Sequence, residues 1–471
     1  MTVTVVSTLA ACQMLARPGS AGAGRWPLLW PVFGACLALG CLAAVAPAAQ
    51  AAPAATSGRP PPARDNRDTA GSYADLGLRQ ARRGRLDEAA AAFKAALEVA
   101  PGNRSVRYNY ARVLLALGRP GEALGELQQL AAASPGDSEV ALSLIEARFA
   151  SGASGRAIED ARALAEAASD AGALAALGRV LRRSGQPRLA EAALERALSL
   201  SADSPEAWLE SSRLRQHLGD LDGAVAAGQR AAQLAPDSLE AALGYAEALI
   251  SAQFYERARS HLAGPCRAFD NHPEHSYTLG AALFGLHRYL EAAVAFEKAA
   301  ATDPAWGTAR FLLGTSWLAA GEPRRAVEAY RAAVAADPRN PLPFVYLVRA
   351  YDDLGPEFAA RAVSAARQAL QIDPHNVECL TRVARQDLAE GRLAEARTSL
   401  EGIARSHPDI VKPRILLARV YYRLGLSRAA EAERSAIRAL NANQQRVDAA
   451  RGAAARRTPL PGLGFGVAEV Q

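Results

Sequence analysis

The feature that most constrains the fold is a period of 34 residues that runs through most of the chain. Pro101 and Pro135 are 34 residues apart, and so are Gly280 and Gly314. A fixed period of this length is typical of a solenoid, in which one supersecondary motif is copied along the chain and each copy packs on its neighbours. Because a solenoid grows by adding copies, the length of 471 residues does not imply several domains.

Eleven repeats align in this period. They begin near residues 70, 104, 138, 171, 205, 239, 273, 307, 341, 377 and 411. Each repeat contains two stretches in which apolar or small residues recur at helical spacing, as in Leu279, Gly280 and Leu283, and this predicts two amphipathic helices per repeat. Alanine, which costs least to place in a helix, dominates the composition.

Two small residues mark fixed positions, counted from the first residue of each repeat. A glycine at position 15 can adopt the left-handed conformation that ends a helix, and it occurs in eight repeats as Gly84, Gly118, Gly152, Gly185, Gly219, Gly321, Gly391 and Gly425. An alanine at position 20, displaced by the two extra residues in repeat nine, lets two helix backbones approach closely. It occurs in every repeat as Ala89, Ala123, Ala157, Ala190, Ala224, Ala258, Ala292, Ala326, Ala362, Ala396 and Ala430.

The pattern resembles the tetratricopeptide repeat (TPR) family. The match is complete in the first repeat, with Tyr73, Leu76, Gly77, Gly84, Ala89, Phe93, Ala96 and Pro101. The resemblance implies an all-α, right-handed superhelical solenoid of about eleven helix-turn-helix motifs over residues 70–444. It also implies a concave groove that holds an extended or helical segment of a partner protein. Repeat six runs on through Pro265 and repeat nine carries extra residues around Gly355, so we expect a kink or an altered superhelical pitch at both.

Residues 1–51 have the pattern of a secretory signal peptide. Arg25 precedes an apolar run that ends at Ala46, and small residues follow up to Ala51. We expect cleavage after Ala51 and export, to the periplasm. Two alternatives stay open: the apolar run is long enough to remain as an N-terminal membrane anchor, or Cys41 is lipidated.

The segments that flank the repeats are polar or glycine-rich. Residues 52–69 contain a run of three prolines, and we expect an extended linker there. Residues 445–471 contain Gly462-Leu-Gly-Phe-Gly466, which neither follows a strand nor opens a helix, so we expect a flexible tail rather than a phosphate-binding loop.

Charge and cysteine content exclude several classes of protein. The net charge of +6 is small for this length and argues against a nucleic-acid-binding protein. Beyond residues 1–51 the chain has only Cys266 and Cys379, which lie more than three repeats apart. A disulfide requires Cα atoms within about 7 Å, so we expect both thiols to be unpaired.

No residues could be assigned to catalysis, to a cofactor or to a metal, and we therefore expect a protein that is not an enzyme. The segment Asp270–His275 gathers metal-capable side chains. However, a metal site needs three or four convergent ligands, and a polar loop between repeats is the simpler interpretation. An enzyme with unrecognised catalytic residues stays the weakest alternative.

The resemblance places positions 2, 5, 9 and 12 of each first helix on the concave groove. Position 9 is an arginine in six repeats, namely Arg112, Arg179, Arg213, Arg349, Arg385 and Arg419. Repeats seven and eight carry large apolar side chains at positions 5 and 12, namely Tyr277, Phe284, Phe311 and Leu318. We predict that these ten residues bind the partner. Two other interpretations stay open: the arginines reflect an arginine-rich composition, and the apolar side chains pack between neighbouring repeats.

The predicted function is that of an exported adaptor that binds a protein or peptide, an acidic one if the arginines contact it. The alternative is a membrane-anchored or lipidated structural subunit of an envelope machine for secretion, pilus assembly or polysaccharide export. Nothing points to nucleic acid, and a membrane would be contacted only through an uncleaved or lipidated N-terminal segment. The sequence does not identify the partner, the pathway, the oligomeric state or the start codon (Met1 or Met14).

Overall fold

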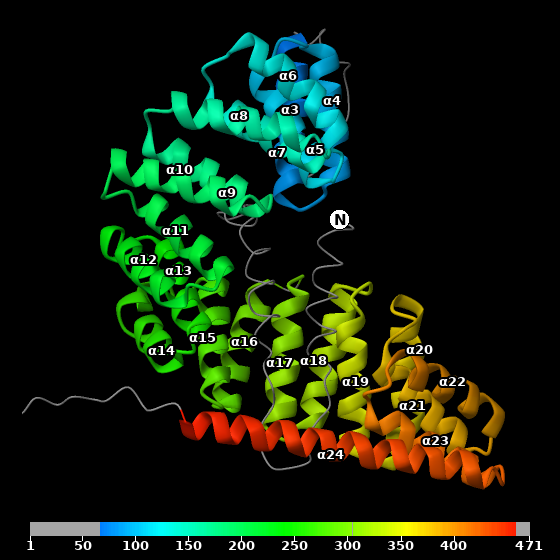
Figure 1. Ribbon diagram of the computed structural model, residues 1–471. Helices are drawn as coiled ribbons and strands as arrows, with labels where there is room; N and C mark the ends of the chain where they lie inside the picture. The colour runs from blue at the N-terminus through cyan, green and yellow to red at the C-terminus, as the bar shows by residue number, and fades with distance from the viewer. Residues whose placement is uncertain (1–65, 304, 458–471) are drawn as a thin grey trace, which may run out of the picture. The chain divides into compact units, whose positions relative to one another are not determined.

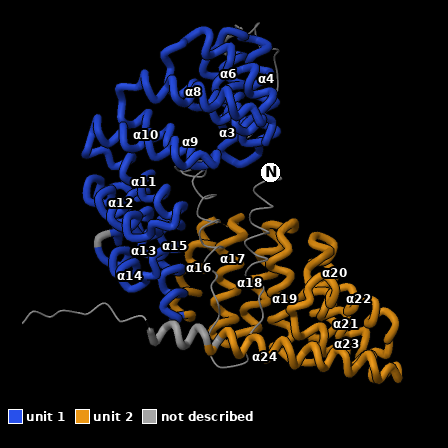
Figure 2. The backbone as a smooth tube through the Cα atoms, viewed as in Figure 1, with its two compact units in different colours: residues 1–8, 30–288 blue, residues 9–29, 289–471 orange. Residues whose placement is uncertain are grey.

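The computed structural model describes residues 66–303 and 305–457. Within them the chain forms eleven successive pairs of α-helices and no β-strand (Figure 1). The chain divides between Arg288 and Tyr289 into two compact units, which are described separately (Figure 2). The predictions for residues 1–51, and for most of the linker and the end of the tail, fall outside the described residues.

Unit 1 contains thirteen α-helices. They are α3 (Asn66–Arg82), α4 (Leu86–Val99), α5 (Arg104–Ala116), α6 (Pro120–Ala133), α7 (Ser138–Ala150), α8 (Ser154–Ala167), α9 (Ala171–Arg183), α10 (Pro187–Leu200), α11 (Pro205–Leu218), α12 (Leu221–Leu234), α13 (Leu239–Ser251), α14 (Tyr255–Ala263) and α15 (Pro273–Gly285). A short 3₁₀ helix, η2 (Pro265–Phe269), follows α14. It occupies the stretch where repeat six was expected to be irregular.

Unit 2 contains the remaining nine α-helices of the described chain. They are α16 (Tyr289–Thr302), α17 (Gly307–Ala319), α18 (Pro323–Ala336), α19 (Pro341–Leu354), α20 (Ala359–Ile372), α21 (Val377–Ala389), α22 (Leu393–Ser406), α23 (Val411–Arg423) and α24 (Ser427–Arg457). The extra residues of repeat nine form the 3₁₀ helix η3 (Pro356–Phe358).

The helix boundaries confirm the predicted phase of the repeat and correct its two ends. From repeat two onward, each first helix begins at the predicted first residue of its repeat. The first repeat begins earlier, because α3 starts at Asn66, inside the predicted linker. Residues 445–457 were predicted to lie in a flexible tail, but they form the last part of the 31-residue helix α24.

Short side-chain caps explain why the first helices start where they do. Asn103, Asp137, Ser204 and Asn376 stand immediately before α5, α7, α11 and α21, and each accepts a hydrogen bond from a backbone amide of the first turn. Such a cap satisfies one of the amide groups that have no partner inside the helix. The caps therefore position each first helix from local sequence.

In ten repeats the residue at position 15, between the two helices, has a left-handed backbone conformation, whether or not it is a glycine. All eight predicted glycines have positive φ, between +70° and +85°. In repeats six and seven the same position is occupied by Gln253 (φ 62°) and His287 (φ 61°). A side chain in this conformation is disfavoured by about 1–2 kcal/mol relative to glycine, so these two turns form at some cost in stability.

The core of each repeat depends on small residues that face large ones. The alanine at position 20 is fully buried in ten repeats and nearly so in the last, at Ala430. The glycine at position 8 lies against a large side chain at position 24: a Cβ atom on Gly314 would come within 2.6 Å of the Tyr330 ring. Repeat nine has a larger residue, Val348, at position 8 and a small one, Ala366, at the place that corresponds to position 24 after its two extra residues, and both are buried.

Candidate functional site

Two of the six arginines at position 9 bind a carboxylate of the following repeat. In unit 1, Arg213 of α11 donates to Glu240 of α13 at 2.9 Å. In unit 2, both nitrogens of the Arg349 guanidinium on α19 donate to Glu378 of α21, at 2.7 and 2.5 Å. Each glutamate occupies position 2 of its repeat, so the same geometry recurs in both units. These two arginines connect first helices of neighbouring repeats, and their guanidinium groups already bind a glutamate of the chain.

The other four arginines at position 9 are exposed. Arg385 lies 3.5 Å from Asp352 of the preceding repeat, because the following repeat has Lys412 at position 2 and offers no carboxylate there. Arg112, Arg179 and Arg419 form no hydrogen bond or ion pair with any described residue.

Arg112 and Arg179 do not bind the glutamate that the following repeat has at position 2. Glu139 and Glu206 stand at position 2 of the repeats after Arg112 and Arg179, but neither forms the bridge. Glu206 instead accepts a hydrogen bond from the Ser204 hydroxyl at 3.2 Å. Arg112 and Arg179 are therefore the guanidinium groups of unit 1 that remain open at this position.

The large apolar residues predicted as partner anchors mostly belong to the core. Tyr277, Phe311 and Leu318 are buried, with 1%, 4% and 7% of their surface exposed, and Phe284 is half-buried. The Phe311 ring packs edge-on against Tyr346 of the next repeat, with ring centroids 4.9 Å apart. The expectation that these side chains line an open groove is therefore wrong for Tyr277, Phe311 and Leu318, because all three are buried, and Phe311 is packed against the next repeat.

A charged cluster on α9, α11 and α13 was not anticipated. Glu210 is almost fully buried and accepts hydrogen bonds from Arg182 at 3.1 Å and from Arg213 at 2.8 Å. Glu247, at position 9 of repeat six, interacts electrostatically with the same arginines and glutamates, and burial raises its pKa to about 7. Arg213 opposes that rise, while Glu240 adds to it. An arginine at position 9 followed by a glutamate at position 2 of the next repeat marks the Arg213–Glu240 pair. The same pattern at Arg112 and Glu139 forms no bridge, so the sequence pattern alone would not have identified the cluster.

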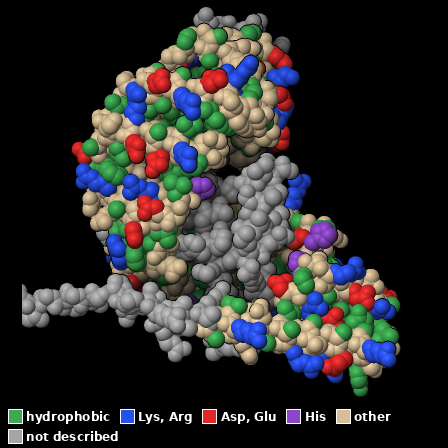
Figure 3. All heavy atoms as spheres, viewed as in Figure 1, with side chains coloured by type: hydrophobic (Ala, Val, Ile, Leu, Met, Phe, Trp, Pro, Cys, Tyr) green, Lys and Arg blue, Asp and Glu red, His purple; other side chains and the backbone are tan. Residues whose placement is uncertain are grey.

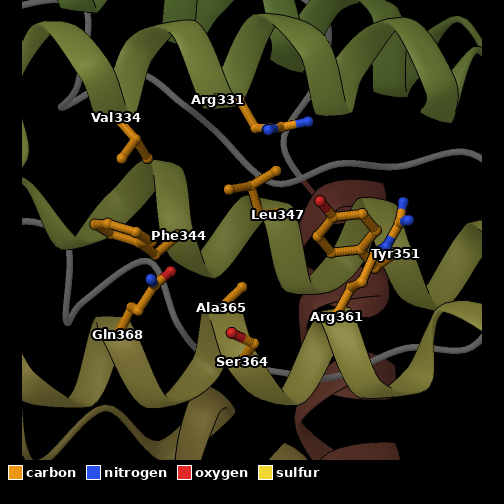
Figure 4. Close-up of a pocket in the computed structure, with 9 residues that line it drawn as sticks. All are labelled: Arg331, Val334, Phe344, Leu347, Tyr351, Arg361, Ser364, Ala365 and Gln368. Carbon is orange, nitrogen blue, oxygen red and sulfur yellow. The ribbon is translucent and has the colours of Figure 1, made fainter.

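Unit 2 contains a cavity of about 520 Å³ between two second helices, α18 and α20, and the first helix α19. Its lining comes from α18, α19 and α20 and consists of Arg331, Val334, Phe344, Leu347, Tyr351, Arg361, Ser364, Ala365 and Gln368 (Figure 4). The α19 residues of this lining are at positions 4, 7 and 11. At about 100° per residue, they lie on the face of α19 opposite to Arg349 at position 9. Sequence analysis did not predict this cavity, because its residues come from three helices.

The thiol of Cys266 and the imidazole of His261 lie close together in repeat six. Cys266 lies 3.2 Å from the Nε2 atom of His261. Burial raises the pKa of the Cys266 thiol to about 11, so this thiol stays protonated at neutral pH, and burial also lowers the pKa of His261. Cys266 and Cys379 are unpaired, as predicted. Among the residues that the structure describes, no group of three or more His, Cys, Asp or Glu side chains is arranged to hold a metal ion.

The surface of unit 1 mixes charges of both signs. On the face shown in Figure 3, basic and acidic side chains are interspersed rather than gathered into a patch of one sign. None of the helices in the described part of the chain combines the length and the apolar character needed to cross a membrane.

Comparison with known proteins assigns the repeat to a family. Residues 81–147, 175–239, 277–341 and 359–411, more than half of the chain, match models of the tetratricopeptide repeat. No curated protein matches the chain.

Several solved structures are similar to the chain at low sequence identity. Yeast Tom70 is 15% identical, covers 83% of this chain and 97% of its own, and has a TM-score of 0.36. PilW, a widely conserved type IV pilus biogenesis factor, is 18% identical, covers 45% of this chain and 97% of its own, and has a TM-score of 0.41. A tetratricopeptide repeat protein from Parabacteroides merdae is 17% identical, covers 53% of this chain and 99% of its own, and has a TM-score of 0.38. From the matched segments and the repeated helix pairs, the chain belongs to the tetratricopeptide repeat family.

Proposed function

We propose that this protein is an exported adaptor that binds an acidic segment of a partner protein along the first helices of its repeats. The observation that carries the proposal is that some arginines at position 9 bind a carboxylate of the chain itself while others at the same position bind none. At Arg213 and Arg349 the chain itself supplies the carboxylate, from position 2 of the next first helix. Arg112 and Arg179 present the same group at the same position and have no such carboxylate bound.

The chemistry of the guanidinium supports a carboxylate as the group that is bound. Its planar set of donors matches the two oxygens of a carboxylate, and the two-nitrogen contact of Arg349 with Glu378 is an example within this chain. Arg112 on α5 and Arg179 on α9 are two repeats apart, with Glu146 at position 9 of the repeat between them. Each arginine would contact one acidic residue of an extended partner. Exposed charges also accelerate the encounter of opposite charges, an effect that weakens as salt screens them.

The test is a comparison of two double variants of unit 1. We would immobilise purified wild-type protein, the Arg112→Ala/Arg179→Ala variant and the Arg156→Ala/Arg188→Ala variant, and capture proteins from a cell-envelope extract. The last variant is a matched control, because Arg156 and Arg188 are exposed arginines on second helices, α8 and α10. The first variant should bind the captured partner more slowly and with a weaker dependence on salt, whereas the control should bind like wild type. Equal binding by all three proteins would refute the proposed role of position 9.

Export is the second part of the proposal, and it rests on the pattern of residues 1–51. Mass spectrometry of the protein isolated from its source should find Ala52 as the first residue. An intact leader would support a membrane anchor instead, and a lipid on Cys41 would support a lipoprotein.

A further inference from the structure

The cavity of unit 2 has an apolar floor. Phe344, Leu347 and Tyr351 of α19 form it, and all three are more than nine-tenths buried. Val334 of α18 and Ala365 of α20 flank the floor. Ser364 and Ala365 are small, so α20 leaves space above the two aromatic rings. Its volume of about 520 Å³ lies in the range of ligand pockets, and the cavity is partly open to solvent.

The rim of the cavity is cationic. Arg331 of α18 and Arg361 of α20 are both exposed, and neither forms an ion pair with any described residue. No acidic residue contributes to the lining. The Arg361 guanidinium lies 5.5 Å above the Phe358 ring, and that ring stacks on Tyr351 with centroids 6.1 Å apart. Arg361 is thus held beside the cavity by η3, the insertion peculiar to repeat nine.

The cavity has distinct polar and apolar ends. In Figure 4, both guanidinium groups lie toward the Tyr351 end, while Val334 and Phe344 lie at the other end. The Tyr351 hydroxyl makes no hydrogen bond with any described residue, so it is a further donor at the cationic end. Such a site suits a ligand in which an apolar group lies next to an anion.

We propose that this cavity, the Arg331–Arg361 pocket, binds an acidic segment of a partner protein. A large apolar side chain of that segment enters over Phe344 and Leu347, and a neighbouring carboxylate binds Arg331, Arg361 and the Tyr351 hydroxyl. Charge complementarity selects this occupant, since two arginines that form no ion pair, in a lining without an acidic residue, favour an anion. The pocket lies on the face of α19 opposite to position 9, so it is a second binding surface and does not depend on the proposed role of Arg112 and Arg179.

The test measures binding of a defined peptide to the purified full chain. The probe is a fluorescein-labelled peptide, Gly-Ser-Glu-Phe-Glu-Ser-Gly, followed by fluorescence anisotropy. The proposal expects saturable binding that weakens with salt. Replacing phenylalanine by serine in the probe, or both glutamates by glutamine, should each weaken binding by about tenfold or more, because each change removes one half of the recognition.

Variants of the protein then locate the site. Arg331→Gln with Arg361→Gln should weaken binding by about tenfold or more. Arg324→Gln with Arg367→Gln is the matched control, because it removes exposed arginines from the same two helices outside the pocket, and it should bind like wild type. Ala365→Leu should block the probe by filling the cavity, with the helical circular dichroism spectrum showing that the fold is kept.

Three results would overturn the proposal. Equal losses in the two arginine pairs would show a general attraction between charges. A loss in Arg112→Ala/Arg179→Ala but not in Arg331→Gln/Arg361→Gln would place the probe on the first helices, in support of the proposed function and against this pocket. If decanoate bound in a way that depends on Arg331 and Arg361 and the peptide did not bind, the occupant would be a lipid-like acid.

Discussion

At the scale of single residues, Phe311 shows how packing changes the meaning of an aromatic side chain. The residue is buried between α17 and α19, so Phe311→Ala should lower the free energy of unfolding by about 3–5 kcal/mol through lost contacts and a cavity. Tyr422→Ala is the control, since Tyr422 is 69% exposed in the same unit, and it should change stability little. Urea denaturation of both variants measures the difference. A Phe311→Ala protein as stable as wild type would contradict the observed burial.

Glu247 makes a second prediction at this scale, on the dependence of stability on pH. Its pKa is raised from 4.5 to about 7 in the folded protein. Between these values the folded chain holds a proton that the unfolded chain has released, so this contribution to stability is complete below pH 4.5 and is lost as the pH rises toward 7. Glutamine does not ionise, so the Glu247→Gln variant does not lose this stability as the pH rises. Its stability relative to wild type should therefore increase as the pH rises from about 4 to about 8.

Denaturation of wild type and of Glu247→Gln at several pH values measures this effect. The comparison cancels other groups that titrate in the same range, including His261, whose lowered pKa acts in the opposite direction. A stability difference that does not change with pH would mean that Glu247 is ionised throughout the range.

At the scale of the helix pair, two glycines should respond in opposite ways to replacement by alanine, because one faces open space and the other faces a large side chain. A Cβ atom on Gly402 in α22 would point into open space, so Gly402→Ala should stabilise the protein by up to about 1 kcal/mol through helix propensity. Gly314 faces the Tyr330 ring, which a Cβ atom would approach to 2.6 Å, and Gly314→Ala should destabilise by about 1–3 kcal/mol through overpacking. Thermal unfolding of the two variants should give shifts of opposite sign. Shifts of the same sign would show that Tyr330 moves aside without cost.

At the scale of the whole molecule, stability should be distributed over the repeats. In the last repeat, α24 makes its main contacts with α23, and α23 also contacts α21 and α22. Removing residues 411–471 should therefore leave the other repeats folded, with circular dichroism losing only the helical signal of the deleted part. The remaining protein should still unfold cooperatively on heating. Loss of the entire helical signal would show that the last repeat is required for the others.

The sequence alone was sufficient for the helix pairs, because their signals are local. The caps before the first helices, the glycines at position 15 and the alanines at position 20 act within a few residues or within one repeat. These features repeat every 34 residues, so each copy confirms the others. The early start of α3 and the length of α24 were missed because the ends of the chain lack a neighbouring copy for comparison.

Only the tertiary structure decided which residues can meet a partner. Arg349 and Arg419 have the same position in the repeat, yet Arg349 is bound to Glu378 while Arg419 forms no hydrogen bond or ion pair with a described residue. Phe311 is covered by the next first helix, and the Arg331–Arg361 pocket combines residues of three helices. A periodic sequence specifies the position of a side chain within its own repeat. The charge and size of the side chains that face it come from neighbouring repeats, and these determine whether it is bonded, buried or open.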